Sequence, residues 1–198
     1  PYNWPHYLEK AELERMCVLA IDIGGTGTKM GCAQITEAGL VLRSIEVYAS
    51  QDHDSLSEII NLYFSHADHT CDQASIAIAG PIKNDSCKLT NLSWTIEKTT
   101  LQNNFRFSQI YLLNDLEAQG YAVIHPEFLE VETIKGSAPA SGNLAILAPG
   151  TGLGEAFVGS FNGTYHPFPS EGGHCDFSPT NPLEMELLEF VKRKHKRV

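Results

Sequence analysis

The sequence has few positive charges. Fourteen Lys and Arg residues stand against 24 Asp and Glu, which gives a formal net charge of −10 at pH 7. Such a protein is repelled by nucleic acid and by anionic membrane surfaces, so neither is an expected partner. Five of the basic residues lie within the last seven positions, 192–198, where they complement the dipole of a C-terminal helix. We interpret this basic tail as a solvated helix end.

Long apolar runs and paired cysteine motifs are also lacking. We find no signal peptide and no transmembrane stretch, which favours a cytoplasmic protein. The cysteines form no CxxC pair and leave an odd one over, so we expect reduced thiols rather than disulfides. They are Cys17, Cys32, Cys71, Cys87 and Cys175.

A P-loop is missing, but another glycine-rich segment stands near the start of the chain. An apolar strand ends at Asp22 and continues through a turn with glycines at 24, 25 and 27. Glycine lets successive backbone N–H groups approach an anion, and Thr26 and Thr28 add hydroxyl donors. Asp22 is positioned to face the magnesium ion that accompanies a nucleotide, through water. The segment predicts an ATP phosphate site, and the alternative is a hairpin that binds no ligand.

A second turn of the same kind follows much later in the chain. Leu147 to Gly154 again places glycines and a threonine between two apolar strands. Two such hairpins are able to hold one phosphate chain from both sides. The alternative is that Gly152 and Gly154 only serve the geometry of a hairpin.

Asp115 is the candidate general base. It follows an apolar strand, so its carboxylate lies at the carboxyl end of that strand, where open α/β sheets bind ligands. Phosphoryl transfer needs one acid that orients and deprotonates the acceptor hydroxyl. Asn114 is expected to hold a neighbouring hydroxyl. The alternative is that both residues only cap the next helix.

Glu171 and His174 offer a hydrogen-bond acceptor and a donor three residues apart, separated by two glycines. Such a pair suits adjacent sugar hydroxyls. Two metal ligands, or a buried histidine in a turn, are the alternatives.

The hydrophobic period alternates between strand and helix, which predicts an α/β protein. We expect an N-terminal helix within residues 1–16, an α/β lobe at 17–125, a connecting segment at 126–143 and a second lobe at 144–198. The expected strands are 17–23, 28–35, 40–48, 74–79, 110–113, 144–149, 154–160 and 164–168. The expected helices are 7–16, 54–66 with Asp54 as cap, 97–104, one from 114–115, and 182–194.

Six ordered motifs of this sequence resemble those of bacterial-type glucokinase, a member of the actin-like ATPase and sugar kinase superfamily. They are Asp-Ile-Gly-Gly-Thr (22–26), Ala-Gly-Pro-Ile (79–82), Leu-Thr-Asn-Leu-Ser-Trp (89–94), Leu-Asn-Asp (113–115), Gly-Thr-Gly-Leu-Gly (150–154) and Glu-Gly-Gly-His-Cys-Asp-Phe (171–177).

The resemblance implies an actin-like (ribonuclease H-like) fold of two α/β lobes and ATP-dependent phosphorylation of glucose at its 6-hydroxyl. It implies Asp115 as the base and places glucose at Asn114, Glu171, His174 and, with weaker support, Asn91. It implies that the ATP phosphates are held by Ile21, Asp22, Ile23, Gly24, Gly25, Thr26, Gly150, Thr151 and Gly152. A homodimer is a further expectation.

Members of that family are longer than this chain of 198 residues. We therefore expect the small lobe with only the beginning of the large lobe, an N-terminal part that exposes apolar surface and is marginally stable or adhesive. A related zinc-containing group has a cysteine cluster after the histidine, which is absent here, so zinc is not expected. The alternative functions are a sugar-binding or regulatory module without catalysis, or a kinase for another hexose.

Overall fold

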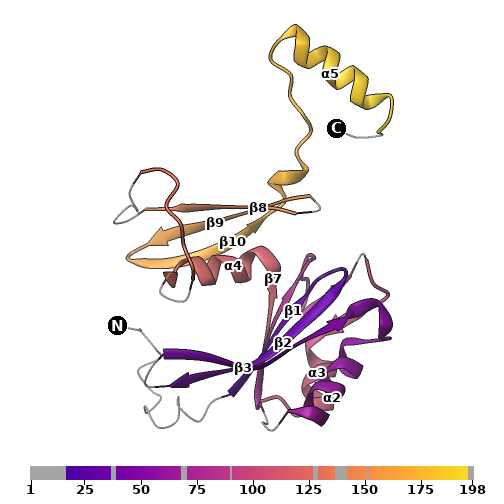
Figure 1. Ribbon diagram of the computed structural model, residues 1–198, viewed down its shortest axis with the longest axis vertical. Coiled ribbons are helices and arrows are strands. Elements are labelled where there is room, and N and C mark those ends of the chain that lie inside the picture. The colour runs from indigo at the N-terminus through magenta and orange to yellow at the C-terminus, as the bar shows by residue number, and fades with distance from the viewer. Residues whose placement is uncertain are drawn as a thin grey trace. The chain divides into compact units, whose positions relative to one another are not determined.

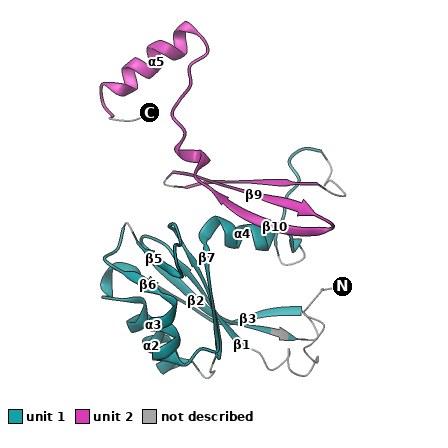
Figure 2. Ribbon diagram, turned by 180° about the vertical axis from the view of Figure 1, so that it is seen from behind, with its two compact units in different colours: residues 1–137 teal, residues 138–198 magenta. Residues whose placement is uncertain are grey.

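The computed structural model describes residues 17–36, 39–67, 71–89, 91–126, 129–136, 142–150 and 152–195. The helix expected at 7–16 and Thr151 lie outside these residues. Figure 2 colours two compact units, Pro1–Ser137 and Ala138–Val198.

Unit 1 is built on a five-stranded mixed sheet in the order β3-β2-β1-β4-β7. The first three strands are antiparallel neighbours, and β4 and β7 run parallel to β1. Each of the five strands forms from a run with many apolar residues. Its observed bounds lie within two residues of the predicted bounds at each end. The bounds are β1 (Cys17–Ile23), β2 (Gly27–Thr36), β3 (Gly39–Ala49), β4 (Gln73–Ile78) and β7 (Gln109–Asn114).

The core of unit 1 lies on one face of this sheet. Alternate residues of β1 and β4 are buried there, and α2 (Leu56–His66) supplies Leu56, Ile59, Ile60 and Tyr63 at helical spacing. The helix α3 (Lys98–Phe105) adds Leu101 to the same core. In Figure 1, α2 and α3 lie together, and α4 (Asp115–Val123) lies apart from them.

The opposite face of the sheet carries small side chains. Ala20, Ser75 and Ala77 line a cavity of about 260 Å³ there together with Asp22 and, from α4, Ala118. The cavity therefore borders the carboxyl end of β1, where the sequence predicts a ligand.

Two local expectations are corrected. The N-cap of α2 is Ser55, whose hydroxyl accepts the Glu58 N–H at 3.3 Å, and not Asp54. Asp54 instead donates its backbone N–H to the Glu58 carboxylate at 2.9 Å. In addition, a short hairpin of β5 (Ser86–Lys88) and β6 (Thr95–Glu97) precedes α3, and the sequence did not predict it. A one-turn helix, η1 (Ser50–Asp52), follows β3.

The expectation of reduced thiols is also wrong for two of the cysteines, because Cys17 and Cys32 form a disulfide. In the register of β1 and β2, Cys17 faces Gln34 and Cys32 faces Leu19, so the two cysteines are diagonal neighbours on one face. Their Cα atoms lie 6.1 Å apart, within the usual range for a disulfide. The sequence does not predict this disulfide, because the spacing of cysteines along the chain does not give the register of two strands.

Unit 2 contains a three-stranded antiparallel sheet, β10-β9-β8, followed by a turn and a helix. The elements are β8 (Leu144–Pro149), β9 (Leu153–Phe161), β10 (Thr164–Ser170), η3 (Gly172–His174) and α5 (Pro182–Lys192). Asn181 caps α5 by accepting the Glu184 N–H at 3.1 Å.

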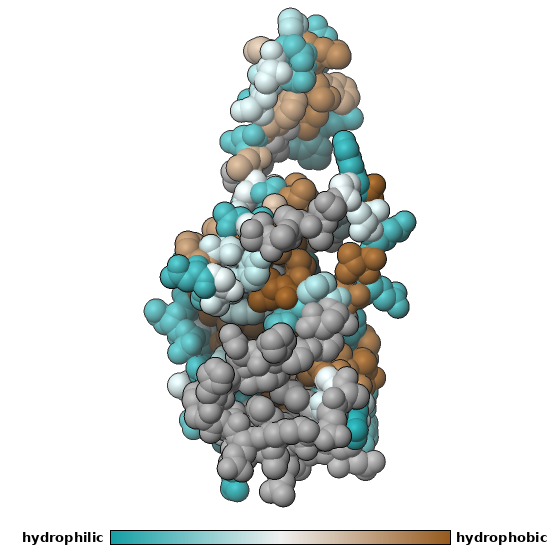
Figure 3. All heavy atoms as spheres, turned by 90° about the vertical axis from the view of Figure 1, so that its left-hand side faces the viewer, coloured by the Kyte–Doolittle hydropathy of each residue, from teal (hydrophilic) through white to brown (hydrophobic). Residues whose placement is uncertain are grey.

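Apolar side chains on α5 are exposed to solvent, and Figure 3 shows brown spheres on this helix. They are Leu183, Met185, Leu187 and Phe190. No helix among the described residues has both the length and the hydropathy that crossing a membrane requires.

Candidate functional site

The turn between β1 and β2 is fixed from behind by two buried hydroxyls. Within the turn, the Gly24 N–H donates to the Gly27 carbonyl at 2.9 Å. Ser50 donates its hydroxyl to the Gly24 carbonyl at 3.2 Å and its N–H to the Thr26 carbonyl at 3.3 Å. The hydroxyls of Ser50 and Thr28 lie 3.0 Å apart, and both side chains are fully buried.

This geometry corrects the expected role of Thr28, whose hydroxyl points inward to Ser50 and not toward a ligand. Sequence reasoning missed Ser50 altogether. The alternation of buried and exposed positions along β2 is a signal that places Thr28 inside, but nothing near Ser50 indicates that it returns to the turn.

The glycines of the first turn lie close to neighbouring atoms, which leaves little room for a side chain. A Cβ atom at Gly24 would lie 3.1 Å from the Gly27 carbonyl oxygen, and one at Gly25 would lie 3.2 Å from the Asn91 side-chain nitrogen. The structure therefore brings Asn91, expected near the sugar, against the tip of the first hairpin. The side chains of Thr26 and Asn91 are both exposed there.

The carboxyl ends of β1, β4 and β7 meet at one edge of the sheet. Ile23, Ile78 and Asn114 are partners in adjacent registers of these parallel strands. Asn114 caps α4, since its side-chain oxygen accepts the N–H groups of Leu116 and Glu117 at 3.0 and 3.4 Å. Asn114 is thus a helix cap, which leaves open whether capping is its only role, and its contact with a sugar stays a prediction.

Asp115 lies half-buried at the same edge, as the first residue of α4. One carboxylate oxygen accepts the Leu116 N–H at 3.0 Å. Burial raises the pKa of this carboxyl, and the negative charge of Asp22 raises it further. The two carboxylates predicted to work together are therefore close enough to interact electrostatically, and a raised pKa makes Asp115 a stronger base when it is ionised.

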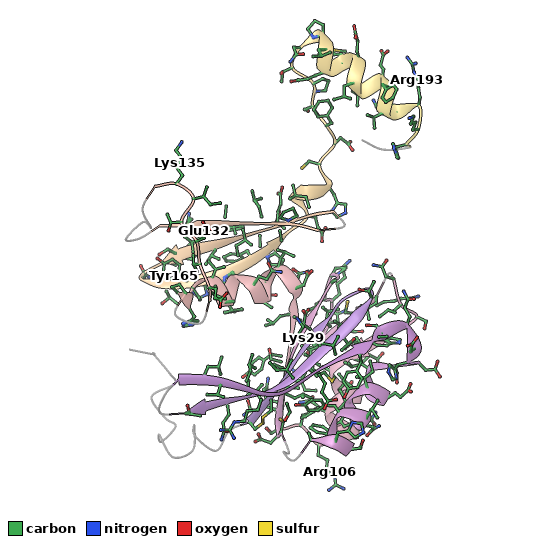
Figure 4. The ribbon with its side chains drawn as sticks, in the orientation of Figure 1. Lys29, Arg106, Glu132, Lys135, Tyr165 and Arg193 are labelled. Atoms are coloured by element: carbon green, nitrogen blue, oxygen red, sulfur yellow. A yellow bond between two sulfur atoms is a disulfide. The ribbon has the colours of Figure 1, made fainter. Side chains whose placement is uncertain are left out.

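Lys29 is a further charged group that the sequence reasoning did not assign. It comes from β2, is labelled in Figure 4, and stands directly across from Asp22 in the register of β1 and β2. Directly opposite residues of paired strands share a face of the sheet, and both side chains are exposed. Counting forward across the short turn from Asp22 is the signal that finds it. Its ammonium group adds positive charge on the face of the sheet that carries Asp22.

The second glycine turn joins β8 and β9. The Gly150 N–H donates to the Gly152 carbonyl at 2.9 Å. A Cβ atom at either glycine would meet nothing within 4 Å, and neither residue has the positive φ that favours glycine. Gly150 and Gly152 are exposed, so the fold of unit 2 by itself does not explain why these positions are glycine.

Glu171 immediately precedes the short helix η3, and His174 is its last residue. The His174 Nδ1 and the Glu171 Oε2 lie 3.1 Å apart, and both side chains are 76% exposed. The alternative of a buried histidine is therefore wrong. A Cβ at Gly172 would overlap the Glu155 carboxylate, and one at Gly173 would overlap the Leu153 carbonyl. The two glycines thus let the turn lie flat against β9 and present the pair to solvent.

Comparison with known proteins places these residues in a family. A sequence model described as "Glucokinase" matches residues 19–198. The glucokinase of Nostoc punctiforme is 37% identical over 187 aligned residues, which cover 90% of this chain and 53% of that protein. The glucokinase of Xylella fastidiosa (strain 9a5c) is 33% identical over 190 residues, covering 91% and 56%. The chain therefore spans about half the length of the curated relatives it matches.

Solved structures are similar as well. A glucokinase from an Antarctic psychrotroph has a TM-score of 0.75 and 29% identity, covering 92% of this chain and 58% of that one. A Streptomyces griseus ROK family glucokinase, in complex with glucose and AMPPNP, has a TM-score of 0.56 and 20% identity, covering 84% and 53%. These likenesses confirm the expected actin-like α/β fold class.

Proposed function

The chain belongs to the glucokinase family, and from this premise we propose that the protein transfers a phosphoryl group from ATP to the 6-hydroxyl of glucose. Asp115 accepts the proton of that hydroxyl. The observation that carries the proposal is the position of Asp115 at the carboxyl edge of the sheet, half-buried and within electrostatic range of Asp22. Asp115 also accepts the Leu116 N–H in the first turn of α4, but that structural role does not require Asp22 nearby.

The residues of the two hairpins suit the phosphates of ATP. In unit 1, residues 21–26 comprise the end of β1 and a tight turn at 24–26 that is fixed by Ser50. In unit 2, Gly150 and Gly152 stand exposed at positions where the fold does not require glycine. ATP supplies the phosphoryl group, and magnesium, held by Asp22 through water, neutralises charge on the phosphates. The related Streptomyces griseus protein, in complex with AMPPNP, supports the choice of nucleotide.

The exposed polar side chains suit the sugar. Glu171 accepts a hydrogen bond from one sugar hydroxyl, and His174 donates one to the adjacent hydroxyl. The turn at η3 already sets the separation of the two side chains. The Asn114 amide nitrogen donates one hydrogen to the Gly80 carbonyl at 3.4 Å, and its second hydrogen suits a sugar hydroxyl. Asn91 contributes beside the first hairpin. Glucose in the structures of similar proteins supports this class of substrate.

We also propose a cytoplasmic location and a homodimer, with glucose and ATP as the small-molecule partners and neither nucleic acid nor membrane as a partner. The net charge of −10 supports the exclusion of anionic partners.

A coupled ADP-release assay with a panel of hexoses tests the proposal. It is run on this chain and on a chimera that appends the second half of the Nostoc punctiforme relative. Glucose-dependent ADP release by the chimera is the expected result. Faster turnover of mannose or fructose than of glucose would make it a kinase for another hexose. Glucose binding without ADP release from any hexose would make it a sugar-binding module.

A further inference from the structure

Three cysteine sulfurs converge at the opposite end of β1 from Asp22. Cys17 begins β1, Cys32 lies in β2, and Cys71 lies two residues before β4. Their sulfur atoms all lie within 4.8 Å of one another, although the three residues are far apart in the sequence. The strands β2, β1 and β4 are neighbours in the sheet, so the fold and not the local sequence assembles this cluster.

The cluster is enclosed. Cys32 and Cys71 are buried, and Cys17 is partly buried. The Cys71 Sγ lies 2.7 Å from the Cys17 Sγ, which is also bonded to Cys32. Asp22 lies five positions after Cys17 along β1, or about 17 Å away at about 3.3 Å per residue. The three sulfurs therefore form a centre distinct from the phosphate hairpin.

We propose that Cys17, Cys32 and Cys71, when reduced, bind one soft d10 cation of the Cu(I), Zn(II) or Cd(II) type through three thiolates. Thiolates are the ligands that such ions prefer. With a metal–sulfur distance of about 2.3 Å, sulfurs around one ion lie about 3.8 to 4.0 Å apart. Sulfurs that already converge within 4.8 Å need only small side-chain rotations to take that spacing.

A buried hydroxyl stands beside the cluster. Tyr63 of α2 is 1% exposed, and among the described residues its hydroxyl has no hydrogen-bond partner, although the Cys32 N–H approaches its oxygen. Burial raises the pKa of Tyr63, and the nearby Cys71 raises it further. An unpaired buried hydroxyl is costly, and a thiolate at Cys71 is the acceptor that it lacks. Tyr63 is thus placed to stabilise a thiolate ligand as an outer-shell donor.

The chemistry balances in two steps. An external dithiol gives two electrons and two protons to the Cys17–Cys32 bond, which breaks into two thiols while the dithiol becomes a disulfide. The cation then binds, and each thiol that becomes a thiolate releases its proton to solvent. Because the cation binds thiolates and displaces the thiol protons, the apparent affinity rises with pH.

The test uses Cd(II) as the probe. The full chain is reduced with a dithiol, freed of reductant without air, and titrated while sulfur-to-cadmium charge-transfer absorption is recorded. We expect one ion per chain and protection of three thiols against a thiol-specific reagent. Cys17→Ser, Cys32→Ser and Cys71→Ser should each weaken binding at least about tenfold, since each removes one of only three ligands.

Cys87→Ser is the matched control, because Cys87 is also buried but lies in β5, outside the cluster. It should leave the affinity unchanged. If a serine variant fails to fold, as judged by circular dichroism, the count of protected thiols in the unmodified chain still decides. Full affinity in Cys71→Ser, protection of two thiols only, or no binding by the fully reduced chain would each overturn the proposal. These readouts need no sugar and no nucleotide, so they are independent of the proposed kinase activity.

Discussion

The surroundings of Asp115 change the acidity of its carboxyl. Burial and the charge of Asp22 raise the pKa of its carboxyl, so the ionised form is less stable here than in water and gains more by accepting a proton. In the chimera, Asp115→Asn should lower kcat by about 10²- to 10⁴-fold, the usual contribution of a general base. The dissociation constant for glucose should change little, because the amide still accepts the Leu116 N–H.

Steady-state kinetics and glucose titration of this variant check the prediction. Asp72→Asn is the control, since Asp72 is exposed and lies just before β4, away from the carboxyl edge. Unchanged kcat in Asp115→Asn would remove Asp115 from the proposed mechanism.

The same carboxyl should cost stability at neutral pH. Its folded pKa is raised, so between the unfolded and the folded pKa values the native state binds more protons than the unfolded state. Stability therefore falls as pH rises through that window, and the cost is fully present above it. Asp115→Asn should raise Tm at pH 7, and the difference should shrink as the pH is lowered below the folded pKa. Thermal melts across pH measure this, and a difference that grows in acid would contradict the assignment.

At the scale of elements, the first hairpin depends on Ser50, the first residue of the short helix η1 that follows β3. Ser50 holds the Gly24 carbonyl and is paired with Thr28. Ser50→Ala should lower the free energy of unfolding by about 1–3 kcal/mol, because it leaves the buried Thr28 hydroxyl without its partner. Adding Thr28→Val should recover part of this loss, since it removes the orphaned group.

Urea denaturation followed by the fluorescence of buried Trp94 in unit 1 reports these changes. Ser65→Ala is the control, because Ser65 is exposed on α2 and its hydroxyl donates only to the Leu62 carbonyl. A loss in Ser50→Ala no larger than in Ser65→Ala would show that the buried pair does not stabilise the hairpin.

Substitutions in the second hairpin, between β8 and β9, distinguish a ligand-binding role of its glycines from a structural role. Gly150→Ala and Gly152→Ala should leave Tm unchanged, because each new Cβ enters open space. Both should weaken ATP binding by the chimera by about tenfold or more, because the new Cβ keeps the backbone N–H groups of the turn away from the phosphates. A lost hydrogen bond to a charged group is worth about 1.5–3 kcal/mol. Calorimetric titration with ATP and magnesium measures the affinity.

Gly163→Ala is the contrasting variant for this pair. Gly163 has a φ of +79° in the other turn of the same sheet, so this change should lower Tm without a direct effect on ATP. Normal ATP affinity in both Gly150→Ala and Gly152→Ala would mean that this hairpin does not bind the phosphates.

Elements were more predictable from the sequence than the contacts between them. Apolar runs and helical spacing predicted the strands and helices of the described residues, apart from the hairpin of β5 and β6 and the one-turn helices η1 and η3, all of which are only three residues long per element. The pairs Ser50–Thr28, Gly25–Asn91 and Cys17–Cys32 depend on register and on chain crossings. No local pattern encodes those features, so the sequence did not predict them.

At the scale of the whole molecule, the order of the motifs predicted more than the amino-acid composition did. Six motifs in sequence predicted the family and the fold class, which the family model and the solved structures confirm. The roles of Asn91, Glu171 and His174 stay predictions, because a sugar contact depends on a ligand and on surroundings that neither composition nor periodicity describes.

Exposed apolar surface on α5 gives the last prediction. Leu183 is 75% exposed and Phe190 is 53% exposed, and burying one such side chain is worth about 1.5–3 kcal/mol. We expect the chain to self-associate through this helix, weakly at low salt because the net charge of −10 is repulsive, and more strongly when salt screens that charge. Sedimentation velocity over a range of protein and salt concentrations measures the association.

Leu183→Gln with Phe190→Gln should abolish this association while circular dichroism shows the helix content retained. Glu186→Gln is the matched control, because Glu186 is an exposed residue of the same helix and its change leaves the apolar surface intact. A discrete two-chain species lost in the double variant would assign α5 to the proposed homodimer, whereas a continuous series of larger species would mean adhesion without a defined interface. Association that persists in the double variant would remove α5 as its cause, because the surface that drives it would then lie elsewhere.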